Sequence, residues 1–354
     1  MGRVFAKDNE GVLPILSYLT HILITGLLLI ALAACRSQST ASRTDLQSKS
    51  TAAPTYTPVT INNCGVTQTY QKPPERAVTL SQAATEVMLA LGLDKRMVGT
   101  AFQENEILPE YRTTYAQIPV LAKSYPSQEV LLSVEPDFIY GTYLGAFDKK
   151  IAGSRQELLN VGIHSYLSLT HCEQEQFRPQ VATVEDVYSE IRDLGRIFGV
   201  EDRAQKLVAS LKEQLKQTHL KLGKVDAPKR IFWYNSGGNP PVTATCCGIP
   251  NEMIKLAGGH NIFQDLKGRR SFGTVNWEDV VVRNPDVIVL IEADWSSAQQ
   301  KRKLLETNPA YSKLTAVQKE RFIILDSSYT MPGIRNVAGV RQLAQALYPD
   351  RFKQ

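Results

Sequence analysis

Aromatic and cationic side chains stand in the segments that follow the expected strands of this 354-residue chain. Ligands of open α/β sheets lie beyond the carboxyl ends of the strands, so these segments face the place where a ligand would bind. Rings pack on the flat faces of a ligand, and guanidinium groups supply charge with several fixed donors. The candidate ligand-binding residues are Tyr125, Tyr140, Tyr143, Tyr234, Arg269, Arg270, Trp295 and Arg335. The alternative for each tyrosine is core packing, and for each arginine it is a surface position or an ion pair within a lobe.

Metal and enzyme chemistry have weaker support in the sequence. A zinc or manganese site needs several converging His and carboxylate ligands, whereas the histidines beyond the N-terminal apolar run are scattered at His164, His171, His219 and His260. The chain has no G-x-S-x-G elbow, no G-x-G-x-x-G after a strand and no P-loop. Ser236-Gly237-Gly238 follows an expected strand, but a glycine-rich binding loop explains it as well as a nucleophile does. We expect no catalytic residues, no metal site and no cofactor.

The N-terminus carries the most specific targeting signal. Ile22 to Ala34 is an apolar run of secretory-signal length, too short to span a membrane, and it ends in Leu32-Ala33-Ala34-Cys35. This ending resembles a lipobox, the bacterial signal in which the cysteine becomes the lipid-modified first residue. We expect residues 1–34 to be a lipoprotein signal peptide, the alternative being a plain signal peptide or a membrane anchor. Residues 35–60 are rich in Ser, Thr, Ala and Gln and should form a flexible tether.

If Cys35 carries the lipid, four cysteines remain in an oxidising compartment. Cys64 and Cys172 lie in the same half of the chain, which favours a disulfide between them. The neighbours Cys246 and Cys247 leave three possibilities open, namely a vicinal disulfide, two thiols or a soft-metal site. No C-x-x-C pair or histidine cluster accompanies them.

The segment from Thr183 to Gly199 has the pattern of an amphipathic helix that separates two lobes. Thr183 can cap the first turn with Asp186 three residues on, and Gly199 can adopt the left-handed conformation that ends a helix. Apolar residues recur between them at steps of three and four, at Val184, Val187, Tyr188, Ile191, Leu194 and Phe198. The chain exceeds the usual size of a single core. We therefore expect an N-terminal lobe at 61–182, an inter-lobe helix at 183–199 and a C-terminal lobe at 200–354.

The two halves repeat one plan of strands and helices. The strand from Arg230 to Tyr234 corresponds to the strand from Arg76 to Leu80, and residues 277–289 correspond to residues 128–140. In both copies a glutamate stands seven residues before a Pro-Asp pair. Two such repeats in the same order favour duplicated lobes. Strands that alternate with helices predict an α/β fold with mostly parallel sheets. Further expected strands are 96–101, 138–140, 163–167, 287–289 and 321–325, and the expected helices are 85–91, 129–133, 154–160, 201–222 and 337–347.

These segments together resemble the substrate-binding proteins of ABC importers for ferric siderophores, haem and vitamin B12, the class III periplasmic binding proteins. The likeness rests on residues 76–81 with Ala84-Thr85-Glu86, on the helix end at 89–93, on the two Pro-Asp turns and on residues 256–263. It implies two Rossmann-like lobes joined by a single long helix, with the ligand in the cleft between them. It also implies that one surface glutamate on each lobe docks on the permease, and by position these are Glu129 and Glu278.

The resemblance implies a lipid-anchored extracytoplasmic protein that captures a ferric siderophore and delivers it to an ABC permease and its ATPase. Binding of cobalamin or haem by the same fold is the alternative, and a membrane-tethered enzyme or sensor is a remote one. The formal charge of +5 is mild and its basic residues are dispersed, so we expect no nucleic-acid partner. We expect a monomer at the periplasmic face of the cell membrane.

Overall fold

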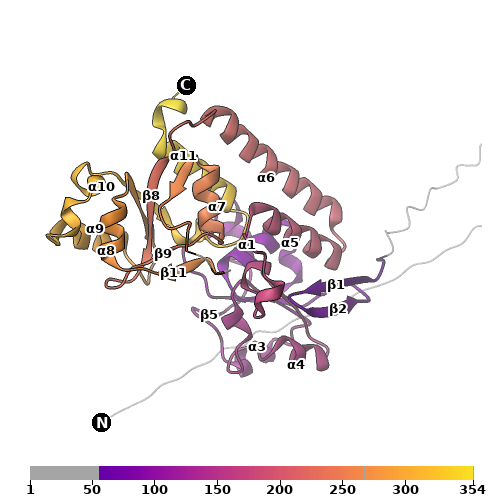
Figure 1. The fold of residues 1–354 in the computed structure, drawn as a ribbon. Helices are drawn as coiled ribbons and strands as arrows, with labels where there is room; N and C mark the ends of the chain where they lie inside the picture. The colour runs from indigo at the N-terminus through magenta and orange to yellow at the C-terminus, as the bar shows by residue number, and fades with distance from the viewer. Residues whose placement is uncertain (1–55, 267, 269, 354) are drawn as a thin grey trace, which may run out of the picture. The chain divides into compact units, whose positions relative to one another are not determined.

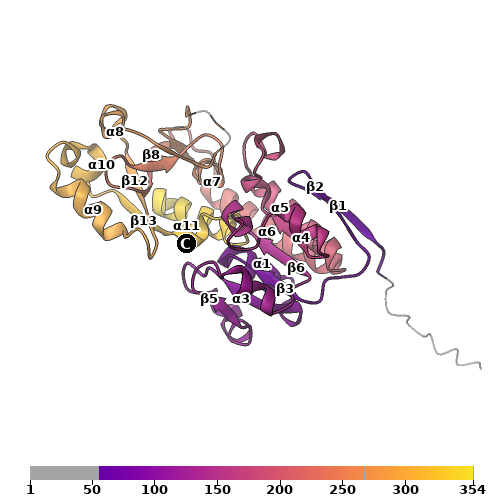
Figure 2. The same ribbon diagram turned by 90° about the horizontal axis from the view of Figure 1, so that it is seen from below.

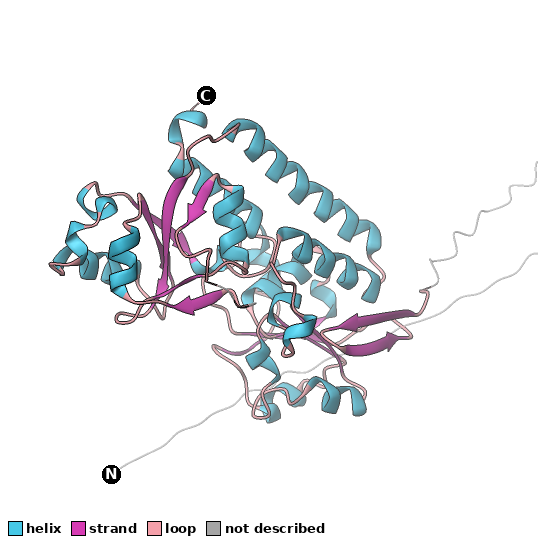
Figure 3. Cartoon of the chain, viewed as in Figure 1, coloured by secondary structure: helices cyan, strands magenta, loops and turns pink. Residues whose placement is uncertain are grey.

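The computed structural model describes residues 56–266, 268 and 270–353, which form two larger sheets with helices around them and a separate two-stranded hairpin (Figures 1 and 3). We call the first half, residues 56–182, the first lobe, and the described part of residues 223–353 the second lobe. The expected signal peptide, the lipidation site Cys35 and the tether as far as residue 55 lie outside the described residues. No helix in this described part has the length and apolarity that a membrane crossing requires.

The first lobe holds a sheet of five parallel strands in the order β5-β4-β3-β6-β7. The chain runs outward from β3 in one direction and from β6 in the other, so the pair β3 and β6 forms the switch point beside which ligands bind in such sheets. The strands are β3 (Ala77–Thr79), β4 (Met97–Ala101), β5 (Val120–Ala122), β6 (Phe138–Gly141) and β7 (His164–Leu167). The helices are α1 (Gln82–Ala90), α2 (Arg112–Tyr115), α3 (Gln128–Ser133) and α4 (Arg155–Asn160).

The second lobe holds a mixed sheet in which β8, β10, β12 and β13 are parallel, while β9 pairs antiparallel with β8 and β11 pairs antiparallel with β9. Its strands are β8 (Lys229–Ser236), β9 (Val242–Ala244), β10 (Gly259–Asn261), β11 (Phe272–Thr274), β12 (Val287–Glu292) and β13 (Phe322–Asp326). Its helices are α7 (Ile249–Leu256), α8 (Trp277–Arg283), α9 (Ala298–Thr307), α10 (Thr315–Gln318) and α11 (Asn336–Leu347). The α/β architecture with mostly parallel sheets is confirmed.

The helix expected between the lobes is α5 (Val184–Ile197), and its ends have the predicted caps. The backbone N–H and the hydroxyl of Thr183 donate to the Asp186 carboxylate at 2.7 and 3.0 Å. Gly199 takes a φ of 65°, in the left-handed region that favours glycine. The caps therefore place the end of α5 where the sequence predicts it.

Helix α6 (Glu201–Leu222) packs against α5 and contacts both lobes. A Cβ atom on Gly195 of α5 would lie 2.5 Å from the Cβ of Ala204, so the close approach of the two helices requires glycine there. Near the start of α6, Arg203 donates to the carbonyl of Gly92 in the first lobe at 3.0 Å. At its end, the carbonyl of Leu222 accepts from Arg351 of the second lobe.

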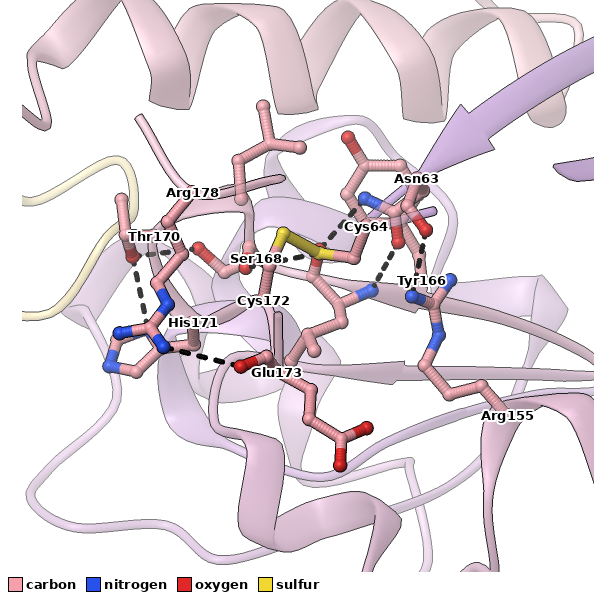
Figure 4. Close-up of a disulfide and its surroundings, with 12 residues drawn as sticks. Asn63, Cys64, Arg155, Tyr166, Ser168, Thr170, His171, Cys172, Glu173 and Arg178 are labelled. Carbon is pink, nitrogen blue, oxygen red and sulfur yellow. Dashed lines mark hydrogen bonds between the residues drawn. A yellow bond between two sulfur atoms is a disulfide. The ribbon is translucent and has the colours of Figure 1, made fainter. Parts of the chain in front are cut away.

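A hairpin that the sequence did not predict precedes the first sheet. Its strands are β1 (Val59–Asn63) and β2 (Val66–Tyr70), so the last two residues of the expected tether belong to a strand. The turn residues Cys64 and Gly65 have φ values of 53° and 82°, as a tight two-residue hairpin turn requires. A Cβ on Gly65 would lie 2.3 Å from the Phe177 ring, so only glycine fits. Cys64 forms a disulfide with Cys172, the pairing that the sequence favours, across a Cα–Cα distance of 5.1 Å (Figure 4).

The lobes meet near the start of α11, where Arg335 of the second lobe pairs with Glu86 of the first, and Figure 2 shows α11 at this junction. The side-chain amide of Asn105 in the first lobe donates to the Asp326 carboxylate at 2.8 Å and to the Ser327 hydroxyl at 2.9 Å. The backbone N–H of Ala182 donates to the carbonyl of Cys247 at 2.8 Å. Polar groups at or after the ends of strands thus contribute to the contact between the lobes.

Candidate ligand-binding cleft

A cavity of about 640 Å³ lies between the lobes at the carboxyl ends of their strands. Its wall in the first lobe is the segment 103–109 after β4, together with Arg112. Its wall in the second lobe includes Asp294, which follows β12, and Asp326, which ends β13. A ligand is expected at this edge of open α/β sheets. We call it the acidic cavity, because Glu104, Asp294 and Asp326 line it without an ion pair to any described residue.

Three aromatic side chains adjoin this cavity without being among its lining residues, and we call them the aromatic wall. The rings of Phe102 and Tyr125 stack with centroids 4.5 Å apart, and the ring of Tyr143 meets Phe102 edge-on at 5.9 Å. On its other side Tyr143 meets the ring of His171 at 5.2 Å. Phe102 has a φ of 56°, which a bulky residue rarely adopts, so the chain turns sharply as β4 ends. The structure therefore brings together two candidates, Tyr125 and Tyr143.

The phenols of this wall keep their protons. Burial raises the pKa of Tyr125 and of Tyr143 well above the usual value, and the nearby Glu104 carboxylate raises both further. The Tyr143 hydroxyl lies 3.3 Å from each carboxylate oxygen of Glu104 and also contacts the Sδ atom of Met331. Burial raises the pKa of Glu104 to about 7, while the hydrogen bond from Tyr143 lowers it and Asp326 raises it. The wall thus offers hydroxyl donors and a poorly solvated carboxyl group.

Arg335 lines the acidic cavity, but its guanidinium group is already engaged. It forms a bidentate ion pair with Glu86 of α1, in which Nε lies 2.7 Å from Oε2, and both side chains are buried. Its remaining donors reach the carbonyl of Glu106 at 2.7 Å and the Ser328 hydroxyl at 2.8 Å. This arginine joins the lobes, and a direct contact between Arg335 and a ligand stays a prediction.

Tyr140 and Tyr234 are core residues. Each is 1% exposed, Tyr140 within β6 and Tyr234 within β8. Tyr140 packs edge-on against Tyr166 at 5.8 Å, and the Tyr234 hydroxyl donates to the carbonyl of Gly237 at 2.5 Å. Side chains in a strand alternate between the two faces of the sheet, and these two are covered on their own face. Core packing, the alternative stated for each tyrosine, explains both.

A second cavity of about 470 Å³ is lined by residues of both lobes, and we call it the basic cavity. Its cationic side chains are Arg178 and Arg270, the latter exposed and predicted to bind ligand. Arg178 donates through Nη2 to the carbonyl of Glu173 at 3.2 Å, whereas its buried Nε has no hydrogen-bond partner in the described part of the chain. The candidate Arg269 lies outside the described residues. Trp295 is 55% exposed and borders Asp294 in sequence, and it lines neither cavity.

The two expected docking acids hold equivalent positions. Glu129 is the second residue of α3 and Glu278 the second residue of α8, and both are exposed. Neither forms an ion pair with a residue that the structure describes. Val130 and Val282 beside them are 41% and 85% exposed. The docking role of these acids stays a prediction.

The adjacent Cys246 and Cys247 form a disulfide, so of the three possibilities the structure has the vicinal bridge. The carbonyl of Cys246 accepts from the side chain of Asn251 at 2.7 Å. Within the described ranges no three His, Cys, Asp or Glu side chains are arranged to hold a metal ion.

Sequence reasoning missed the acids of the cleft. Glu104, Asp294 and Asp326 each stand at or within a few residues of the end of a strand, the same position by which the aromatic candidates were found. A search of these positions for every polar residue type, and not only for rings and cations, would have found them. His171 and Arg178 come from the long segment after β7, where no periodic pattern marks a position.

Two α/β lobes with a cavity at the facing ends of their strands define a two-lobed binding protein. The sequence matches the periplasmic binding protein family over residues 78–329. The chain belongs to this family, so it is an extracytoplasmic substrate-binding protein for transport and not an enzyme.

Relatives support this membership. The chain is 26% identical over 301 residues to the uncharacterized ABC transporter substrate-binding lipoprotein YvrC of Bacillus subtilis, covering 84% of this chain and 88% of that protein. It is 25% identical over 280 residues to the vitamin B12-binding protein of Vibrio cholerae, covering 78% and 90%.

Solved structures are similar over almost their whole length. A periplasmic binding protein from Veillonella parvula superposes with a TM-score of 0.73 at 31% identity, covering 82% of this chain and 98% of that one. A protein of an ABC-type Fe3+-hydroxamate transport system from Saccharomonospora viridis superposes with a TM-score of 0.68 at 27% identity, with the same coverages. This chain is a substrate-binding protein of an ABC importer, and such proteins work with a permease and an ATPase.

Proposed function

We propose that this protein captures a ferric siderophore between its lobes and delivers it, as a lipid-anchored monomer, to an ABC permease. The aromatic wall carries the proposal. Tyr125 and Tyr143 keep their phenolic protons, so their rings pack on a chelate while their hydroxyls donate to the oxygen atoms around the iron. In a siderophore the chelator surrounds the iron, so the protein has to supply no metal ligand. The Fe3+-hydroxamate protein at 27% identity supports the same ligand class.

Haem and cobalamin are the alternatives. Haem is favoured by one observation, the contact between the rings of Tyr143 and His171, since both residue types bind haem iron axially. Two features oppose it, namely the raised pKa of Tyr143, which disfavours a phenolate, and the acidic cavity, which would face the haem carboxylates. Cobalamin is supported by the relatives named for vitamin B12.

Ligand titrations monitored by intrinsic fluorescence would test the ligand class. We expect quenching by ferric hydroxamates and none by haem or cobalamin; quenching by haem or cobalamin alone would overturn the proposal. Tyr143→Phe should weaken chelate binding because it removes the hydroxyl that contacts Glu104 in the lining of the acidic cavity. Tyr311→Phe, which changes a tyrosine stacked on Trp277 away from the cleft, should bind as the unmodified protein does.

The double variant Glu129→Ala with Glu278→Ala tests delivery to the permease. It should abolish uptake and leave chelate affinity unchanged, because both acids are exposed and lie outside the cavities. Glu213→Ala with Glu320→Ala removes two exposed acids at unrelated positions and should transport normally. Normal uptake by the first pair would refute the docking role.

A third experiment concerns the anchor. Cys35→Ser should release the protein from the membrane fraction of expressing cells, because it removes the residue that carries the lipid. Persistence of the variant in the membrane fraction would contradict lipid attachment at this cysteine.

A further inference from the structure

The charge of the acidic cavity restricts the ligand further than the proposed function does. Both arginines in its lining are neutralised, because Arg112 pairs with Glu106 at 2.6 Å and Arg335 pairs with Glu86. The other carboxylates have no cationic partner in the part of the chain that the structure describes. They are Glu104, Asp294 and Asp326. The lining therefore carries an excess of negative charge in the place where the family fold puts its ligand.

Glu104 is the carboxylate best placed to meet a ligand. It lines the cavity, it is half-buried, and it stands two residues after Phe102 of the aromatic wall. Its one described hydrogen-bond partner is the Tyr143 hydroxyl, which has a single proton to give. A carboxylate accepts several hydrogen bonds, so most of its capacity remains free. Burial without a counter-charge is costly for a carboxylate, and a cation from the ligand would remove that cost.

Asp326 differs from Glu104 because the protein directs several donors to one of its oxygens, Oδ1. Its carboxylate accepts from the Asn105 side chain at 2.8 Å and from the backbone N–H of Ser328 at 2.8 Å. It adds negative potential beside Glu104 but has less capacity for a new donor. Asp294 is exposed at the rim of the cavity, where water screens its charge.

We propose that Glu104 binds an ammonium group of the ligand, so that the protein selects a ferric chelate with a protonated amine and no net negative charge. The proposal rests on the proposed function and adds the charge class of the chelate. The chelate packs on Phe102, Tyr125 and Tyr143, and its amine reaches the Glu104 carboxylate at the end of this wall. Tris-catecholate complexes, which are strongly anionic, are rejected by the same carboxylates.

Calorimetric titration of the full chain in detergent, at pH 8, tests this directly. The probes are the ferric complex of a linear trihydroxamate that ends in a primary amine, the same complex with the amine acetylated, and a ferric tris-catecholate. We expect the amine form to bind about tenfold more tightly than the acetylated form, a ratio that corresponds to about 1.4 kcal/mol. The catecholate should not bind.

Two variants test whether Glu104 causes the preference for the amine-bearing complex. Glu104→Gln keeps the shape of the side chain and should reduce the ratio between the amine and acetylated forms to about one. Glu110→Gln, an exposed acid of the same loop that does not line the cavity, should keep the full ratio. Thermal unfolding of both variants controls for their folding.

The outcomes separate this inference from the proposed function. Equal binding of the two hydroxamate forms by the unmodified protein would overturn the inference and leave iron-chelate binding standing. A ratio that survives in Glu104→Gln would overturn the role of Glu104. Failure of every chelate to bind, with binding of haem or cobalamin instead, would overturn the proposed function itself.

Discussion

The acidic and the basic cavity of the cleft are walled by loops that are held in different ways. The acidic cavity is bounded by the segment 103–109, which the buried pair of Arg335 and Glu86 fixes to the second lobe. Arg335 donates to the carbonyl of Glu106, and Glu86 accepts from the backbone N–H of Leu108 at 3.1 Å. One ion pair thus positions this wall and joins the lobes at the same time.

The basic cavity is bounded in the first lobe by the segment after β7, which the hairpin and α5 hold, although its last residue, Ala182, also donates to the Cys247 carbonyl of the second lobe. The disulfide of Cys172 with Cys64 ties this segment to the hairpin (Figure 4). The Phe177 ring packs on Gly65 in the turn of the same hairpin. Buried Glu190 of α5 accepts from the hydroxyl of Ser168 and from the next backbone N–H, at 2.8 and 2.9 Å. A covalent bond and a buried carboxyl group hold this wall, and neither involves the second lobe.

The two walls should therefore respond to different perturbations. Loss of the ion pair should loosen the acidic wall and the contact between the lobes together. Loss of the disulfide should loosen the basic wall and leave the lobes in contact.

Removal of the Cys64–Cys172 disulfide should have the largest effect. The bond spans 108 residues of sequence, and a closed loop of this size restricts the unfolded chain by about 4 to 5 kcal/mol in the chain-entropy account. Cys64→Ser with Cys172→Ser should therefore lower the free energy of unfolding by about 4 kcal/mol in urea titrations.

The vicinal disulfide provides the matched control. Cys246 and Cys247 are adjacent, so their bond closes almost no loop. Cys246→Ser with Cys247→Ser should change the free energy of unfolding by less than about 1 kcal/mol. Similar losses from the two double variants would show that loop closure is not the source of the stability.

Arg335→Ala should have the next largest effect. Glu86 is 1% exposed and would be left as a buried carboxylate without its partner, which costs about 3 kcal/mol or more. The matched control is Arg112→Ala, which breaks an exposed ion pair with Glu106 and should cost less than about 1 kcal/mol. Urea unfolding of both variants gives the comparison, and equal losses would deny that burial makes the difference.

Glu190 should make stability depend on pH. Burial raises the pKa of its carboxyl group from 4.5 to about 8, against the lowering effect of its two hydrogen bonds. Between these values the folded protein keeps a proton that the unfolded chain releases, so stability falls as pH rises. The groups that face it are Ser168, Leu169, Tyr140, Asp186 and Asp193.

The variant Glu190→Gln removes this titration. From pH 5.5 to pH 7.5 the unmodified protein should lose about 2 kcal/mol more free energy of unfolding than the variant does. Parallel stability curves for the two proteins would show that Glu190 is ionised in the folded state across this range.

Most of the fold could be predicted from the sequence because its elements carry local signals. The caps at Thr183 and Gly199 fixed α5, and α6 begins and ends at the predicted residues. Strands β3, β4, β6, β7, β8, β12 and β13 were found because each lies in an apolar run of the kind that parallel sheets bury. The three-residue strands β5, β9, β10 and β11 escaped, since a period cannot be recognised in so few residues.

The candidate site could be predicted only in part, because a position after a strand does not fix the direction of a side chain. Tyr143 and Tyr140 are three residues apart, yet one belongs to the aromatic wall beside the acidic cavity and the other to the core. The sequence made Arg335 a plausible ligand contact, whereas the structure pairs it with Glu86, 249 residues away. Such long-range pairs have no signal in a single sequence.

The smallest effect we expect is on the pH dependence of ligand binding at the acidic cavity. In the free protein the pKa of Glu104 is raised to about 7, chiefly by burial, and the groups that face it are Tyr143, Tyr125 and Asp326. A cationic ligand requires the ionised carboxylate, so the affinity for the amine-bearing hydroxamate should fall by up to about tenfold from pH 8 to pH 6. The acetylated complex, which has no charge to pair, should bind equally at both pH values, and Glu104→Gln should remove the dependence for the amine form. If the affinity of both complexes depended on pH in the same way, a group other than Glu104 would be responsible for the dependence. The negative charge of the acidic cavity, which sets it apart from the basic cavity, would then not select the ligand through Glu104.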